Sequence, residues 1–153
     1  MSYSVPREVV EGFYAAYAAR DIERTAAFLD DDVHWTISGP VDLLAFCGIR
    51  RGKAAVLDMM RRQVAEVFSI YSFVTDAMLI EGDQVATFNR LSARMDEDGR
   101  VISYRLAHFM RFRAGKVVEN LSLIDSFDAA EQVLGYPLAG QSGEAENEEA
   151  AAS

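Results

Sequence analysis

A hairpin within residues 101–125 is the sequence feature that most constrains the fold. Two runs rich in β-branched and aromatic residues flank the turn Arg113-Ala114-Gly115-Lys116, and glycine supplies the positive φ that such a turn requires. Side chains alternate between the two faces of a strand, so Tyr104 and His108 are predicted to share an apolar face. The same alternation places Asp125 at the end of the corresponding face of the next strand. An imidazole and a carboxylate in apolar surroundings are either held by structural partners or used in binding or chemistry.

In the rest of the chain, the sequence predicts that the helices precede most of the strands. Apolar residues at steps of three and four predict helices over residues 6–19 and 52–68, and Asp21 is a suitable N-cap for a short helix between them. Strands are predicted at residues 33–37, 71–80, 84–95, 101–113 and 117–126, with a loop carrying an apolar patch over residues 41–51. Helices followed by an antiparallel meander indicate an α+β domain, in which one curved sheet folds around helices on one face and leaves a cavity at its open end.

Length and charge limit the kind of protein this is. The chain has 153 residues, which suits one domain, predicted over residues 1–137, followed by a simple acidic tail over residues 138–153 that we expect to be disordered. Its formal net charge is −9; the four glutamates of the tail leave about −5 on the remainder, and a negative charge argues against nucleic acid or an anionic membrane as a partner. The single cysteine, Cys47, and the lack of a long apolar segment predict a cytoplasmic protein without a membrane span.

Three phrases of the sequence carry a resemblance to a known family. They are FYAAYAARDIERTAAFLDDDVHW, GIRRGKAAVLDMM and HFMRFRAGKVVENLSLID. With the order of elements, they make residues 9–134 similar to the nuclear transport factor 2-like superfamily, and within it to the SnoaL-like and ketosteroid-isomerase-like proteins. The resemblance implies a cone-shaped, curved antiparallel sheet wrapped around three helices from the N-terminal half, an apolar pocket, and a homodimer formed through the outer sheet face.

The resemblance also allows the family's active sites to be compared with these residues. In ketosteroid isomerases the positions of the oxyanion tyrosine, the base and the oxyanion acid correspond to Phe13, Ile37 and His108, so none of the three groups is retained. Ketosteroid isomerisation is therefore not expected here.

Two other activities of the superfamily fit in part. In limonene-type epoxide hydrolases, Asp125 and Arg90 match two members of the site, but Ser92 stands where the second aspartate belongs. The SnoaL-type polyketide cyclases use a pocket aspartate near a histidine, and His108 and Asp125 occur in that order, with the register of Asp125 left open. The cyclase match is the better of the two.

Each candidate residue also has a purely structural interpretation. His108 is either a ligand contact or general base, or a core histidine bonded to Tyr104 or a backbone carbonyl. Asp125 is either an acid/base or an anchor for Arg90 and the amides of the first helix, and Glu119 is expected at a solvated rim. Arg105, Arg111 and Arg113, on one strand face, are expected to pair with acids on a dimer surface.

The predicted pocket takes its rings from the first helix and first strand. Tyr14, Tyr17 and Trp35 could equally pack a core or line a ligand site. The full set predicted to contact a ligand is Phe13, Tyr14, Tyr17, Trp35, Met60, Arg90, Tyr104 and Leu123. The two histidines do not have a metal-ligand spacing, and no phosphate loop is present, so neither a metal nor a cofactor is expected.

Two functions remain open from sequence. The first is a protein that binds a small hydrophobic molecule without turnover. The alternative is a cofactor-independent isomerase, cyclase or lyase acting on a polyketide-like or steroid-like carbonyl compound. In that alternative His108 and Asp125 exchange protons with an acidic carbon, while Tyr17 or Arg90 stabilises the enolate.

Overall fold

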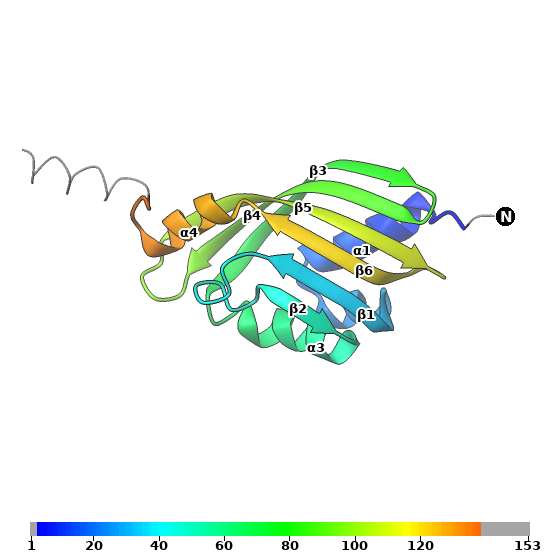
Figure 1. Ribbon diagram of the computed structural model, residues 1–153, viewed down its shortest axis with the longest axis horizontal. Helices are drawn as coiled ribbons and strands as arrows, with labels where there is room; N and C mark the ends of the chain where they lie inside the picture. The colour runs from blue at the N-terminus through cyan, green and yellow to red at the C-terminus, as the bar shows by residue number, and fades with distance from the viewer. Residues whose placement is uncertain (1–2, 139–153) are drawn as a thin grey trace, which may run out of the picture.

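The computed structural model describes residues 3–138, which form one curved, unclosed six-stranded sheet with helices on its inner side (Figure 1). In chain order the elements are α1 (Arg7–Ala18), α2 (Ile22–Ala27), β1 (Leu29–Ser38), β2 (Gly48–Arg51), α3 (Lys53–Asp58), the π-helical turn η1 (Met59–Gln63), β3 (Phe68–Glu81), β4 (Gln84–Met95), β5 (Val101–Arg113), β6 (Lys116–Ile124) and α4 (Ser126–Leu134). The predicted α+β class, with three helices in the N-terminal half, is confirmed. The predicted acidic tail lies outside the described residues, apart from Leu138.

The strand order is β2-β1-β6-β5-β4-β3. Neighbouring strands are antiparallel except for β1 and β6, which pair in parallel. The expectation of a wholly antiparallel sheet is therefore wrong at this one pair. Parallel neighbours need a long connection, and here α3 and four further strands separate β1 from β6 in the sequence.

Helix α1 fills the hollow of the sheet. Its predicted apolar stripe is buried, with Val10 and Phe13 fully enclosed, and the helix passes behind the strands in Figure 1. The predicted N-cap of α2 is confirmed, because the Asp21 carboxylate accepts a hydrogen bond from the Arg24 amide at 3.1 Å. These two helices close one side of the core.

The predicted third helix is shorter than expected and changes character. It leaves the α-helical pattern at Met59, where the amide of Val64 bonds to the Met59 carbonyl at 3.0 Å, five residues back. The apolar stripe of Val56, Met60 and Val64 is buried as predicted. Such π turns are rare and frequently occur at functional sites.

The predicted loop over residues 41–51 contains the short strand β2, which pairs with β1. Its apolar patch is buried at Leu44 and Phe46. Arg50 donates to the carbonyls of Ala45, Phe46 and Cys47 at 2.7–3.0 Å. This guanidinium holds the loop over the inner sheet face.

The β5–β6 hairpin contains an irregularity in strand pairing that the alternation of side chains does not predict. Arg111 pairs with Glu119, whereas Phe112 pairs with Val117, so Val118 is an extra residue on β6. Such a β-bulge reverses which side chains face inward. Beyond it, Asn120 and Ser122 are buried, whereas Leu121 and Leu123 are exposed.

Helix α4 was not predicted and follows the last strand directly. It is attached to the start of β5 by the Gln132 side chain, which donates to the Ser103 carbonyl at 2.7 Å and accepts from the Ser103 amide at 2.8 Å. Arg100 donates to the carbonyls of Gln132 and Val133 at the end of the helix. None of the helices formed by residues 3–138 has the length and hydrophobicity needed to span a bilayer.

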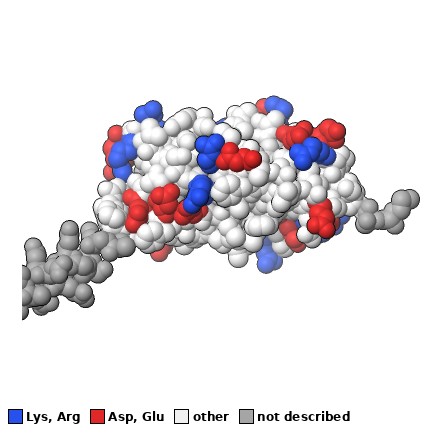
Figure 2. All heavy atoms as spheres, turned by 90° about the horizontal axis from the view of Figure 1, so that it is seen from above, with Lys and Arg blue, Asp and Glu red and all other residues white. Residues whose placement is uncertain are grey.

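Surface charges lie in mixed groups. On the face drawn in Figure 2, basic side chains lie next to acidic ones and do not merge into one basic area. The expected acid partners of the β5 arginines are confirmed: Arg105 pairs with Asp125, Arg111 with Glu119, and Arg113 more loosely with Asp30, at 3.8 Å.

Candidate functional site

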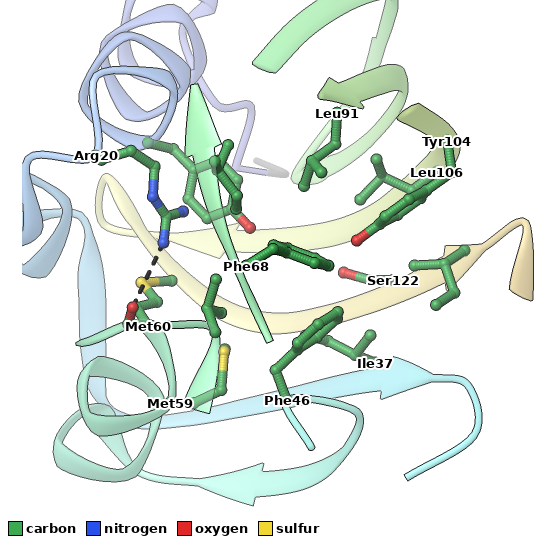
Figure 3. Close-up of a pocket in the computed structure, with 14 residues that line it drawn as sticks. Arg20, Ile37, Phe46, Met59, Met60, Phe68, Leu91, Tyr104, Leu106 and Ser122 are labelled. Carbon is green, nitrogen blue, oxygen red and sulfur yellow. Dashed lines mark hydrogen bonds between the residues drawn. The ribbon is translucent and has the colours of Figure 1, made fainter. Parts of the chain in front are cut away.

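A pocket opens between the end of α1, the α3–η1 segment and the inner faces of β3 to β6 (Figure 3). Its walls are mainly apolar and are formed by Ile37, Phe46, Met59, Met60, Val64, Phe68, Ile70, Leu91, Leu106 and Ile124. The cavity volume is about 30 Å³, which is room for roughly one or two water molecules. A larger ligand therefore requires side chains to move. Met59 and Met60, which the π turn presents to this space, are unbranched and adaptable.

Four polar residues join this apolar wall: Tyr17, Arg20, Tyr104 and Ser122. Figure 3 shows the hydroxyls of Tyr104 and Ser122 directed toward the pocket, and Arg20 at its edge. Burial raises the pKa of Tyr17 and of Tyr104, so both phenols stay protonated and can donate hydrogen bonds. Among residues 3–138, the pocket lining includes no aspartate, glutamate or histidine.

His108 lies behind the pocket, fully buried on the inner face of β5. Its ring packs against Tyr14, Tyr17 and Phe73, each with a centroid separation of 5.9 Å. Of these three, Tyr17 also lines the pocket, whereas His108 itself is not among the described residues that line it. The two structural partners expected for His108 were Tyr104 or a backbone carbonyl; the observed partner is Tyr14, whose hydroxyl lies 2.9 Å from Nδ1.

A chain of buried hydrogen bonds ends at this imidazole. The Thr75 hydroxyl donates to Asn89 Oδ1 at 2.8 Å, and the Asn89 amide donates to Thr87 Oγ1 at 2.9 Å. Thr87 Oγ1 lies 2.5 Å from the Tyr14 hydroxyl. If the Thr87 hydroxyl donates to Tyr14 and the Tyr14 hydroxyl donates to His108 Nδ1, both hydroxyl donors have an acceptor. The imidazole then carries its hydrogen on Nε2.

Three polar atoms on the inner sheet face have no hydrogen-bond partner among the described residues. They are Trp35 Nε1, His108 Nε2 and Asn120 Oδ1. The strand register places Trp35 beside Asn120, and His108 beside Ser122 in the next row. Buried polar atoms without partners are uncommon, so two N–H donors and one carbonyl oxygen are available in the layer behind the pocket.

Burial determines the protonation state of His108. Desolvation lowers its pKa from 6.5 to about 4, so the imidazole is neutral near pH 7. A neutral imidazole with Nε2–H is a hydrogen-bond donor. With so low a pKa it is also a weak base.

The structure separates the residues predicted to contact a ligand into three groups. Tyr17, Met60 and Tyr104 line the pocket. Phe13, Tyr14 and Trp35 are packed in the core behind it. Arg90 and Leu123 lie on the outer sheet face, where Arg90 pairs with Asp76 at 2.7 Å and Leu123 is 44% exposed.

The placement of Asp125 on the same face as His108 is wrong. The β-bulge at Val118 reverses the alternation on β6, so Ser122 is the residue opposite His108. Asp125 instead ends β6 just before α4, where its carboxylate accepts from the Arg105 guanidinium at 3.1 Å. Its structural interpretation as an arginine anchor fits this geometry, with Arg105 in place of Arg90. Glu119 is exposed, as expected for the rim.

Sequence reasoning missed Arg20, Ser122 and the π turn that carries Met59. Simple alternation hides Ser122, because the bulge at Val118 reverses which residues of β6 face inward. Arg20 follows a predicted helix at a position where nothing in the sequence indicates its direction. Among residues 3–138, no cluster of three side chains suited to hold a metal ion is found.

The buried imidazole predicts a specific pH dependence of stability. Between pH 6.5 and about 4 the unfolded chain binds a proton that folded His108 does not, so stability falls as pH falls through this range. From pH 7 to pH 5 the His108 contribution should reduce the free energy of unfolding by about 2 kcal/mol. Urea denaturation at both pH values should show this loss in the wild type and in His34→Gln, which removes the exposed histidine, but not in His108→Asn. Equal pH dependence in all three proteins would contradict the neutral buried state.

Comparisons with known proteins agree with this architecture. The sequence model of the SnoaL-like domain family matches residues 10–120. None of the curated proteins compared with this chain matches it.

Solved structures provide three further comparisons. A candidate isomerase from Rhodopseudomonas palustris is 35% identical, with a TM-score of 0.71 over 82% of this chain and 93% of that one. A nuclear transport factor 2-like protein from Burkholderia thailandensis is 26% identical, with a TM-score of 0.72 over 82% and 94% of the two chains. TerC, co-crystallised with polyporic acid, shares the fold at 20% identity, with a TM-score of 0.74 over 83% and 96%.

The family match covers most of the chain and agrees with the curved sheet and helices described above. The protein therefore belongs to the SnoaL-like domain family of the nuclear transport factor 2-like superfamily.

Proposed function

We propose that the protein binds a small hydrophobic molecule in the pocket between α1, η1 and the inner sheet face. The observation that carries this proposal is the lining, in which the described residues combine apolar walls with a few hydroxyl groups and include no carboxylate. Apolar concave sites with a few oriented polar groups are typical of small-molecule binding. Arg90 and Leu123, expected to contact the ligand, are not part of this proposal because they lie on the other sheet face.

Binding without turnover is favoured over proton transfer by the position of the ionisable groups. Asp125 is on the outside of the sheet, and His108 is fully buried and is not among the described residues that line the pocket. A proton-transfer site needs a base within hydrogen-bond reach of the substrate. The lining residues do not supply a carboxylate or imidazole for that role.

Thermal shift with hydrophobic ketones, polyketide fragments and steroids tests the binding function. A ligand present at 100 times its dissociation constant should stabilise the folded protein by roughly 2.7 kcal/mol and raise Tm by about 5–10 °C. The shift should disappear in Ile124→Trp, because the indole fills the pocket next to Ser122.

Leu79→Trp is the matched control, since Leu79 is 72% exposed on the edge strand β3 and does not line the pocket. It should respond to ligand as the wild type does. Shifts that persist in Ile124→Trp would place the ligand elsewhere and contradict the assignment of this pocket.

An isomerase is the second candidate function. It is favoured by the 35% identity to the candidate isomerase from Rhodopseudomonas palustris. In an isomerase, the hydrogen-bond chain from Thr75 to His108 would hold the imidazole as a buried donor. The Tyr104 and Ser122 hydroxyls could bind a carbonyl oxygen at the pocket. Asp125 no longer has a part in it.

Exchange of carbon-bound protons distinguishes the two functions. For ligands that pass the thermal-shift test, NMR in deuterium oxide should show exchange at the carbon next to the carbonyl no faster than in buffer. Exchange that is accelerated by the wild type and lost in Tyr14→Phe, where His108 Nδ1 has no hydroxyl partner, would instead establish the isomerase-like function.

We also propose a homodimer formed through the outer sheet face, as the family resemblance implies. A cytoplasmic location remains a prediction. Phe109 lies opposite Leu121, and Ala107 lies opposite both Phe88 and Leu123, so the exposed apolar side chains of β4, β5 and β6 are neighbours. Exposed apolar surface of this kind marks interaction sites. The ion pairs of Arg90, Arg105 and Arg111 surround it.

Phe109→Asp tests this interface. A carboxylate at its centre should convert the dimer to a monomer in sedimentation equilibrium, because an unpaired charge cannot be buried there. Leu79→Asp, at the exposed edge strand, should remain dimeric. A monomeric wild type at micromolar concentration would overturn the proposal.

A further inference from the structure

Arg20 supplies the positive charge at the pocket and is the residue that the proposed function does not yet use. It lies two residues after the end of α1 and lines the cavity beside Met60. Its Nη2 donates to the Met60 carbonyl at a long 3.4 Å, and its guanidinium lies 5.7 Å from the centre of the Tyr17 ring. Figure 3 shows the guanidinium at the edge of the pocket, with the dashed bond to Met60.

Most of the hydrogen-bonding capacity of this guanidinium is unused. Within residues 3–138 no carboxylate lies within ion-pair distance of Arg20, whereas Arg62, Arg90 and Arg111 each hold a carboxylate at 2.6–2.9 Å. Within that range its polar neighbours are the Met60 carbonyl, at a long 3.4 Å, and the Tyr17 hydroxyl, whose pKa the guanidinium lowers in opposition to burial. A guanidinium has five N–H donors arranged to bind a carboxylate through two parallel bonds.

The backbone at this position provides independent support. Arg20 has a φ of 56°, in the left-handed region that side chains other than glycine adopt at a cost. Helices commonly end with glycine in this conformation, and α4 of the same protein does so at Gly135, with a φ of 83°. Arg20 lies one residue past Ala19, the C-cap of α1, and keeps this conformation at a cost, which supports a role for its side chain.

A structural role for the charge must be separated from a role in binding. A cation next to the carboxyl end of a helix is favourable because it compensates the helix dipole. That role would not distinguish between ligands of different charge. Selectivity for an anion is therefore the property to measure.

We propose that Arg20 makes this pocket selective for hydrophobic acids. The ligand class is an apolar, ring-containing molecule carrying one carboxylate or ionised enol, whose oxygens pair with the guanidinium while the rings lie among Phe68, Leu91 and Leu106. The hydroxyls of Tyr104 and Ser122 donate to further oxygens of the same molecule. This inference rests on the proposed binding function and specifies its ligand.

Isothermal titration calorimetry with two probes of equal shape tests the proposal. The probes are 2-naphthoate and 2-naphthamide, which differ in charge at the same position. The wild type should bind naphthoate about ten-fold more tightly, as one charge-assisted contact provides. Arg20→Gln should bind both probes equally, with naphthamide affinity near that of the wild type. Arg51→Gln, which removes an exposed arginine, should keep the preference.

Two glycine variants separate binding from backbone strain. Arg20→Gly should raise Tm, because glycine accepts a positive φ, and should lose the preference for naphthoate. Ala114 is the other described residue besides glycine with a positive φ, 49°, and lies in the distant β5–β6 turn. Ala114→Gly should also raise Tm but keep the preference.

The outcomes distinguish this inference from the function on which it rests. Equal binding of the two probes by the wild type, or a preference that survives in Arg20→Gln, would overturn the role of Arg20 and leave the pocket as a binding site. Binding of neither probe would overturn the binding function together with the inference.

Discussion

The structure depends on the packing of α1 into the hollow of the sheet, and Tyr14 ties the two together. Its ring stacks with Phe73 and His108, and its hydroxyl joins β4 and β5 through Thr87 and His108. Each such buried hydrogen bond contributes about 1 kcal/mol, and losing one partner costs more because the other stays desolvated. This contact fixes how far α1 extends into the hollow of the curved sheet. The pocket is the space that remains beyond the carboxyl end of α1.

The pocket is therefore a consequence of where the helix layer stops. Between Arg20 and Phe68, α3 changes into the π turn, and its two methionines close the opening from one side. The cavity that remains is small, so ligand size is governed by how readily these flexible side chains move. The hydroxyl donors of Tyr104 and Ser122 are fixed on strands, whereas the flexible side chains of Met59 and Met60 lie on the π turn. The pocket therefore has fixed hydrogen-bond donors and one adjustable wall.

Function follows from which ionisable groups face this space. The sheet presents Tyr104 and Ser122 to the pocket, keeps His108 neutral in the layer behind, and carries its carboxylates on the outside in ion pairs with arginines. A site with donors and no base is suited to hold an oxygen-bearing hydrophobic molecule more than to move its protons. Because a shared fold does not determine function, the activity of this protein depends on these few side chains.

Local periodicity is enough to predict the class of the fold, the limits of β4 and β5, the buried stripe of α1 and the inward direction of His108. The remaining features depend on contacts between distant segments. The bulge at Val118 moved Asp125 and Leu123 to the outer face and brought Ser122 inward, and one extra residue cannot be recognised from alternation. Likewise, β2, the parallel β1–β6 pair and the position of Arg20 at the pocket arise from contacts between segments distant in sequence. Local sequence determines whether a side chain points inward or outward, but its contact partners depend on how distant segments pack in the fold.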